Sequence, residues 1–146
     1  MTATEASERI AGILTAAGFP RMPARVMMTL MVSDDGLTAT EIGERLGISQ
    51  AAVSGAVRYL QLVGFVARIP VSGSRRDRYA IVQSWYAATM TNMAVYSQVS
   101  DAAADAAASL TPGSAAHSRV TEMADFFTFL QGRMATLLVE WETRRR

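Results

Sequence analysis

The sequence contains no cysteine and only one histidine, His117, among its 146 residues. Without thiols the chain can form neither disulfides nor thiolate metal sites, and it cannot use cysteine catalysis; such a composition is typical of cytoplasmic proteins. A lone histidine without an acidic neighbour at ligand spacing predicts no metal site. We therefore expect a cytoplasmic protein that needs no metal and no cofactor.

Long apolar runs are also missing. None approaches the roughly 18 residues that a membrane span needs. The N-terminal residues, MTATEASERI, have neither the basic segment nor the apolar core of a secretory signal. Half of the residues are hydrophobic, which is enough for a folded core. The length and composition predict one domain over residues 1–146 that makes no contact with a membrane.

Motifs of catalysis are absent from the sequence as well. It has no P-loop, no GxGxxG, no GxSxG and no HExxH pattern. Its serines, threonines and carboxylates form no recognisable constellation, and no segment is left over for a nucleotide-binding domain. The sequence therefore predicts that the protein is not an enzyme.

Lysine is missing too, because all 14 basic residues are arginine. Residues 45–100 contain six arginines and one acid, Asp77. The flanking segments are acidic: residues 1–44 have three arginines and six acids, and residues 101–143 have two arginines and six acids. Positive charge gathered in one segment indicates a polyanionic partner. Arginine suits bidentate contacts to phosphate and guanine, although codon usage in a GC-rich genome also explains the absence of lysine.

The segment from Thr38 to Val63 organises the chain. Thr38 and Glu41 have the spacing of a capping box, which starts a short helix. Gly47 can end that helix with a positive φ, and Ser49 can cap a second helix whose apolar residues keep helical spacing. Two short helices joined by a tight turn predict a helix-turn-helix, whose second helix enters the major groove of DNA.

Two strand-like stretches follow, at residues 65–69 and 78–82, and the polar loop PVSGSRRD joins them. A hairpin with an arginine-rich tip after a helix-turn-helix predicts a winged helix. The chain resembles the MarR family of bacterial transcriptional regulators, closest to its GbsR-like branch. The resemblance rests on Gly18-Phe19-Pro20-Arg21, Ala24-Arg25, LTATEIGERLGISQAAVSGAVRYLQLVGFVAR over residues 37–68 and GSRRDRYAI over residues 73–81.

The expected fold is mainly α with a small β-wing. We expect the winged helix-turn-helix over residues 19–83, with long dimerisation helices in residues 1–18 and 84–146. Predicted helices cover residues 2–17, 24–32, 85–110 and 112–142, in addition to the two helices of the helix-turn-helix, and Leu37 could pair with the wing.

The predicted DNA contacts lie on the second helix of the motif, at the start of the first one and on the wing. They are Thr38, Thr40, Ser49, Gln50, Ala51, Ser54, Arg58, Tyr59, Arg75, Arg76 and Arg78. Glutamine can read adenine, serine reads several bases, and alanine can touch a thymine methyl group. In the commoner wing of the resembled family an acid two residues earlier braces the groove-entering arginine. Here the arginines precede Asp77, so either Arg76, braced by Asp77, or Arg75 would enter the minor groove.

Apolar residues alternate at steps of three and four near the C-terminus, which is the pattern of packed helices. With the first helix they predict a homodimer interface, as closed two-fold dimers match palindromic operators. The alternative is a helical hairpin within one chain. The predicted dimer residues are Ile10, Ile13, Val120, Met123, Phe127, Leu130, Met134, Leu137 and Trp141.

Arg21 and Arg25 lie near the start of the second predicted helix, where the helix dipole disfavours cations. Salt bridges to acidic segments are one interpretation, and a phosphate contact or an intersubunit link is the other.

Members of the resembled family often bind small aromatic or anionic effectors. This resemblance implies a pocket lined by Met28, Trp85, Tyr86 and Met90, although such residues also serve as plain core. We predict a homodimeric transcriptional regulator that binds a pseudo-palindromic duplex operator, represses transcription and is released by an effector. The alternative is a winged-helix module that binds an acidic protein.

Overall fold

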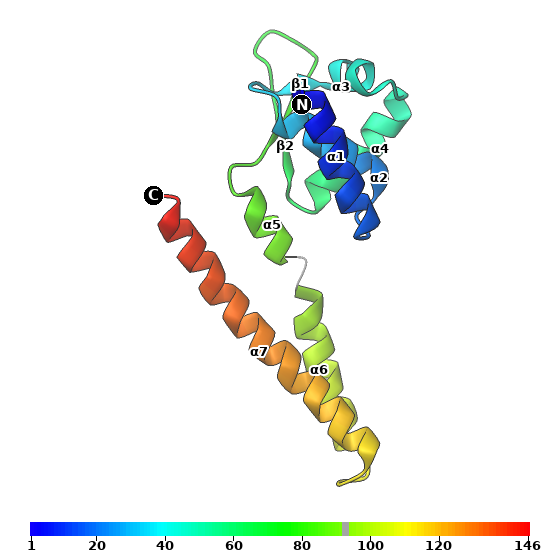
Figure 1. Cartoon of the computed structure of the whole chain (residues 1–146), viewed down its shortest axis with the longest axis vertical. Helices are drawn as coiled ribbons and strands as arrows, with labels where there is room; N and C mark the ends of the chain where they lie inside the picture. The colour runs from blue at the N-terminus through cyan, green and yellow to red at the C-terminus, as the bar shows by residue number, and fades with distance from the viewer. Residues whose placement is uncertain (92–93) are drawn as a thin grey trace. The chain divides into compact units, whose positions relative to one another are not determined.

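A computed structural model describes the backbone of residues 1–91 and 94–146, which form two compact units, Met1–Ala88 and Thr89–Arg146 (Figure 1). The elements are α1 (Ala3–Ala16), α2 (Arg21–Met31), β1 (Leu37–Thr38), α3 (Ala39–Leu46), α4 (Gln50–Leu62), β2 (Val66–Ile69), β3 (Arg78–Ile81), α5 (Trp85–Thr91), α6 (Ala94–Ala108) and α7 (Ala115–Arg144). The mainly helical fold with a small β-wing is as predicted. The proposed division at residues 18 and 83 stays a prediction.

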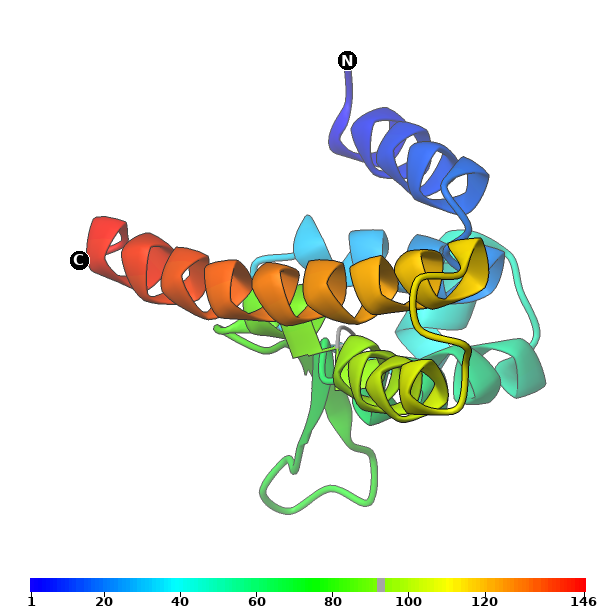
Figure 2. The same cartoon turned by 90° about the horizontal axis from the view of Figure 1, so that it is seen from below.

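The wing is part of a three-stranded antiparallel sheet with the strand order β1-β3-β2. Leu37 pairs with Tyr79 on β3, which confirms the short strand predicted at Leu37. On the other side of β3, Arg68 of β2 also pairs with Tyr79. The green loop between β2 and β3 extends away from the strands that carry it (Figure 2).

The core of the first unit joins α2, α3 and α4. Its most deeply buried large side chains are Ile42, Leu60, Val26 and Val53, each less than 2% exposed. Because α4 contributes residues at steps of three and four, it turns one apolar side inward and leaves the opposite side polar. The first helix packs on α2 through Ala11, which is 1% exposed.

Local signals fix the ends of the predicted helices. Both capping boxes are present: Thr2 with Glu5 at α1, and Thr38 with Glu41 at α3. Gly47 ends α3 at φ 64°, a conformation that costs glycine nothing. The Ser49 hydroxyl accepts a hydrogen bond from the backbone N–H three residues on, so the helix-turn-helix has its predicted caps.

Two predicted helix starts were wrong by three residues. The second helix begins at Arg21 rather than at residue 24, because the Pro20 carbonyl already accepts the N–H of Ala24. Pro23 then lies in the first turn, where its missing N–H costs nothing. The last helix begins at residue 115 rather than 112, because Ser114 is its cap.

The second unit contains an antiparallel hairpin of α6 and α7 (Figure 1). The buried Ser100 hydroxyl donates to the Ala124 carbonyl at 3.0 Å and shares a 2.6 Å hydrogen bond with Thr128. Small residues allow this close approach, and the rings of Tyr96 and Phe127 stack with their centroids 4.8 Å apart. The helix predicted over residues 85–110 is found as α5 and α6, and its continuity through residues 92–93 lies outside the described residues.

None of the helices that the structure describes combines the length and the hydropathy of a membrane span.

Candidate nucleic-acid interface

The polar side of α4 is the first part of the candidate interface. It presents a run of exposed residues that the sequence predicted to contact DNA: Ser49, Gln50, Ala51, Ser54 and Arg58. They are exposed because the opposite side of the same helix, which carries Val53, Ala56, Val57 and Leu60, is buried in the core. Small side chains along this face would let bases approach the helix backbone.

Three of these side chains line one shallow cavity of about 230 Å³. Gln50, Ser54 and Arg58 are spaced four residues apart, so they lie along one side of α4, and Tyr79 of β3 also lines the cavity. The Gln50 amide donates to the Ala39 carbonyl at 3.1 Å, so it ties α4 to the start of α3. The structure therefore gives Gln50 a protein partner that the sequence did not indicate.

Tyr59 is placed differently from the other predicted contacts on α4. It is half-buried, and its ring meets the edge of Phe19 with centroids 5.8 Å apart. Phe19 also meets Phe65 edge-on at 5.9 Å. The ring of Tyr59 is thus part of an aromatic cluster that packs against the core.

The wing carries two exposed arginines, Arg75 and Arg76, at its tip. The nearby acid, Asp77, pairs with Arg68 of β2 at 3.4 Å. Asp77 was expected to brace Arg76 if that arginine enters the groove, but this carboxylate pairs across the hairpin. Sequence reasoning missed Arg68, since only the strand register brings it to Asp77.

The side chain of Arg78, also predicted to contact DNA, has partners within the first unit. Its guanidinium donates to the Gly36 carbonyl at 2.6 Å and lies 3.6 Å from the Glu41 carboxylate. Around it, a hollow of about 370 Å³ brings together four predicted residues from the start of α3 and the wing: Thr38, Thr40, Arg76 and Arg78. The two threonines and the two arginines lie far apart in the sequence, and the fold brings them to one surface; their contact with DNA stays a prediction.

Glu41 is held in its charged form. The Thr38 backbone N–H donates to its carboxylate at 3.2 Å, and this hydrogen bond lowers the pKa of Glu41 most. The Thr38 hydroxyl, Arg78 and Arg45 lower that pKa further. The sum places the pKa of Glu41 below its ordinary value of 4.5.

This shift gives a prediction about acid stability. A carboxylate whose pKa is lower in the folded state than in the unfolded state stabilises the fold above its unfolded pKa of 4.5, and this contribution is lost as pH falls through the lowered value. We expect Glu41→Gln to reduce the loss of unfolding free energy between about pH 6 and about pH 3. Glu44→Gln, on the same helix, is the control in chemical denaturation. An equal acid-induced loss in Glu41→Gln and wild type would contradict the assignment.

Close packing in the helix-turn-helix depends on Gly43. A Cβ atom at this position would lie 2.5 Å from the Gln50 amide nitrogen and 3.2 Å from the Ile48 carbonyl oxygen. A glycine inside a short helix was the only sequence signal for this contact.

The predicted dimer residues on α7 divide between two environments. Phe127 stacks within the hairpin, whereas Met123, Leu137 and Trp141 are 48%, 49% and 44% exposed. On α1, Ile13 is 61% exposed. Val120, Leu130 and Met134 are half-buried, and Ile10 is exposed. The helical hairpin within one chain, which was the alternative to the dimer, thus exists and leaves apolar side chains exposed. The homodimer stays a prediction.

The four residues of the predicted effector pocket have unequal surroundings. Met28 is 6% exposed and lies in the core of the first unit. Trp85 is 39% exposed, and its ring meets Tyr86 edge-on with centroids 6.1 Å apart. Met90 is half-buried. The effector pocket stays a prediction.

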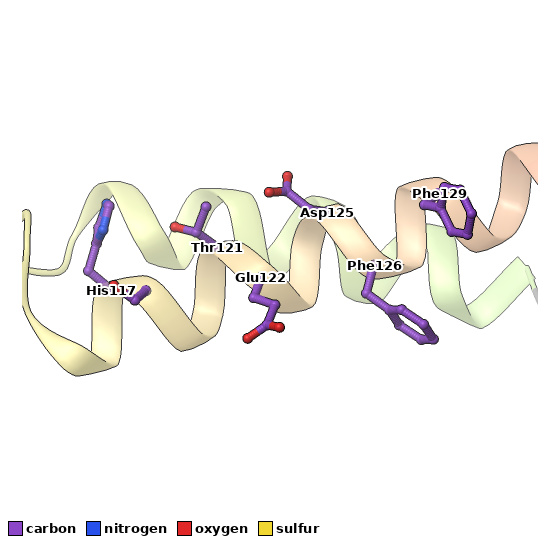
Figure 3. A pocket seen from close by; sticks show the side chains of 7 residues that line it. His117, Thr121, Glu122, Asp125, Phe126 and Phe129 are labelled. Atoms are coloured by element: carbon purple, nitrogen blue, oxygen red, sulfur yellow. The ribbon is translucent and has the colours of Figure 1, made fainter.

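A further hollow of about 640 Å³ lies on the second unit, along α7 (Figure 3). His117, Glu122 and Asp125 line it, together with the exposed rings of Phe126 and Phe129. Within the part of the chain that the structure describes, no three His, Cys, Asp or Glu side chains converge as metal ligands.

The tri-helical core, the capped helix-turn-helix and the hairpin wing define a winged helix-turn-helix protein. Two family models match consecutive parts of the chain: "MarR family" over residues 17–77, and "MmpR5-like MarR family transcriptional regulator" over residues 83–144. Since both describe the same family and together span most of the sequence, the chain belongs to the MarR family of transcriptional regulators.

The chain is also similar to individual proteins. The chain is 30% identical over 84 residues to "Putative HTH-type transcriptional regulator YvaV" of Bacillus subtilis (strain 168), a match that covers 58% of this chain. The matched part is about half of that relative, 48% of its length. A crystal structure of a transcriptional regulator, 21% identical, covers 97% of this chain and 98% of its own with a TM-score of 0.82, which shows the fold. The MepR–DNA complex of S. aureus is 16% identical, with 92% and 90% coverage and a TM-score of 0.45.

Proposed function

We propose that the protein is a sequence-specific regulator that binds duplex DNA in the cytoplasm and represses transcription. The observation that carries the proposal is the surface formed by the polar side of α4 and by Arg75 and Arg76 at the wing tip. Residues 45–100, which contain this surface, have six arginines and one acid. Positive charge beside an exposed helix suits the phosphates that flank a major groove.

Each part of this surface has its own role in the proposal. Ala51, Ser54 and the start of α4 face base edges, because small exposed side chains allow the helix to lie deep in the groove. Arg58 and the threonines at the start of α3 contact phosphates. The wing arginines reach the adjacent minor groove, whose potential is most negative at A·T tracts.

Salt dependence tests the proposal. Neutralising phosphates releases counterions, so log affinity for duplex DNA should fall linearly with log salt, by about 0.9 per phosphate contact. An acidic protein partner would not reproduce this counterion release. Binding to an acidic protein but to no duplex would instead support the interaction module.

We also propose that the protein is a homodimer, and the geometry of α7 supports this proposal. About 3.6 residues make a helical turn, so Met123 and Trp141 share one side of α7, roughly 100° from Ala124. Ala124 is the residue whose carbonyl faces Ser100 of α6. Because α6 has 15 residues and α7 has 30, α6 covers only part of α7. The side of α7 that carries Met123 and Trp141 is largely left exposed. A second copy would cover it.

A charged pair on that side should break the dimer. We expect Met123→Glu with Leu137→Glu to give a monomer by sedimentation equilibrium, because both side chains are about half exposed and would face a partner's apolar helix. Ser118→Glu with Thr136→Glu adds the same charge to exposed positions off that side and should leave the mass unchanged. A wild-type protein that sediments as a monomer would overturn the homodimer.

We also propose release by a small aromatic or anionic effector near Trp85 and Tyr86. The partly exposed Trp85 ring at the start of α5 supports it, since an aromatic surface can stack on such a ligand. Binding would favour one of two states of the dimer. Phenolic acids that neither shift the melting temperature nor weaken DNA binding would count against this effector class.

Within the family we propose the GbsR-like branch. The support is Gly18-Phe19-Pro20-Arg21 followed by Ala24-Arg25, together with a wing in which the arginines precede the acid.

A further inference from the structure

Arg25 lies at a junction of three helices. It belongs to α2, and its Nε donates to both oxygens of Glu8 on α1 at 3.2 Å. Its Nη2 lies 3.2 Å from the same carboxylate and donates to the Leu46 carbonyl, the last of α3, at 3.4 Å. The Arg25 side chain is 20% exposed. The predicted salt bridge is therefore confirmed, and it has a third partner.

The hydrogen bond to the Leu46 carbonyl connects this salt bridge to the helix-turn-helix. The last four carbonyls of a helix have no partner within it, and a cation is favoured there by the helix dipole. Leu46 precedes Gly47, which ends α3, and Ser49 then caps α4. Arg25 thus holds the carbonyl from which the turn of the helix-turn-helix departs.

Glu8 is needed for this geometry. Arg25 is the fifth residue of α2, and the Glu8 carboxylate 3.2 Å away balances its charge. By accepting from Nε with both oxygens and lying 3.2 Å from Nη2, this carboxylate also fixes the orientation of the guanidinium.

We infer that Arg25 is a positioning residue that connects α1, through Glu8, to the turn before the DNA-reading helix. The inference rests on the proposed DNA binding for its consequence, since a displaced turn would displace α4. It stands against the other interpretation of Arg25, a direct phosphate contact or an intersubunit link.

The two roles of Arg25 predict opposite effects of Glu8→Gln on DNA affinity. If Arg25 contacted phosphate, removing Glu8 would free it and raise the affinity for DNA. If Arg25 positions the turn, Glu8→Gln lowers the affinity for the selected operator by about threefold to tenfold, with the salt slope unchanged. Asp35→Asn, an exposed acid in the same unit, is the charge-matched control and should have no such effect.

Further variants separate positioning from simple stability. Arg25→Gln should lower the ratio of operator affinity to random-duplex affinity at a temperature where all variants are folded. The double variant Glu8→Gln with Arg25→Gln should be no worse than Arg25→Gln alone, because both remove one coupled contact. Arg25→Lys keeps the charge but lacks the planar guanidinium. We expect it to have a lower ratio of operator affinity to random-duplex affinity than the wild type.

Hydrogen exchange of the full-length protein gives a reading that needs no DNA. The amides of residues 47–52 should exchange faster in Arg25→Gln and in Glu8→Gln than in wild type. Unchanged exchange, or a higher operator affinity in Glu8→Gln, would overturn the positioning role. A wild-type protein that binds no duplex would instead refute the proposed function, and hydrogen exchange would still decide the role of Arg25.

Discussion

Replacing Arg75 and Arg76 together by alanine should weaken operator binding and flatten its salt dependence by about one unit per lost phosphate contact. Both side chains are exposed at the wing tip, whereas Arg68 pairs with Asp77 and Arg78 with Glu41. The exposed pair is therefore the part of the wing that can reach DNA without first breaking a contact within the protein. Affinity measured by fluorescence anisotropy across a salt series gives both quantities.

The matched control removes the same charge elsewhere. Arg119→Ala with Arg133→Ala takes two exposed arginines from α7. Since these residues lie outside the winged helix, their loss should change the salt slope much less than loss of the wing pair. An unchanged slope in the wing variant would refute the wing assignment, even if affinity fell.

Leu60→Ala should destabilise the protein by about 2–5 kcal/mol, the usual cost of a buried leucine truncation that leaves a cavity. Leu60 is 0% exposed and belongs to the buried core to which α2, α3 and β2 also contribute. Chemical denaturation at one fixed protein concentration measures this cost, because the stability of a dimer depends on concentration.

Leu62, two residues further along α4, provides the control. It is 85% exposed, so Leu62→Ala should change the unfolding free energy by less than about 0.5 kcal/mol. Equal effects of the two substitutions would mean that the side of α4 that carries Leu60 does not face the core. The candidate interface would then be misplaced, because its exposure follows from this orientation.

Sequence patterns predicted the parts of the fold that depend on local chemistry. Capping boxes need residues three apart, and the stop at Gly47 needs one glycine, so both could be read directly. The helix starts at residues 21 and 115 were missed because Pro23 and Pro112 were interpreted as helix starts. In the structure the Pro20 carbonyl accepts the first hydrogen bond of α2, and Ser114 caps α7.

The candidate site was harder to predict, because its contacts join distant residues. Arg78 reaches Gly36 and Gln50 reaches Ala39, and no periodicity connects such pairs. The sequence indicated which residues belong to this surface, but it could not show which of their side chains already have protein partners. For Arg25, charge alone predicted a salt bridge, whereas the Leu46 carbonyl is visible only in the structure.

Selection of bound sites from random duplex DNA, at two salt concentrations, tests the central proposal most directly. A homodimer with one exposed α4 per subunit should enrich an inverted repeat whose half-sites are about one helical turn apart. Higher salt should weaken binding without changing the enriched sequence. Binding without any enriched sequence, or no binding at either salt concentration, would contradict a sequence-specific regulator.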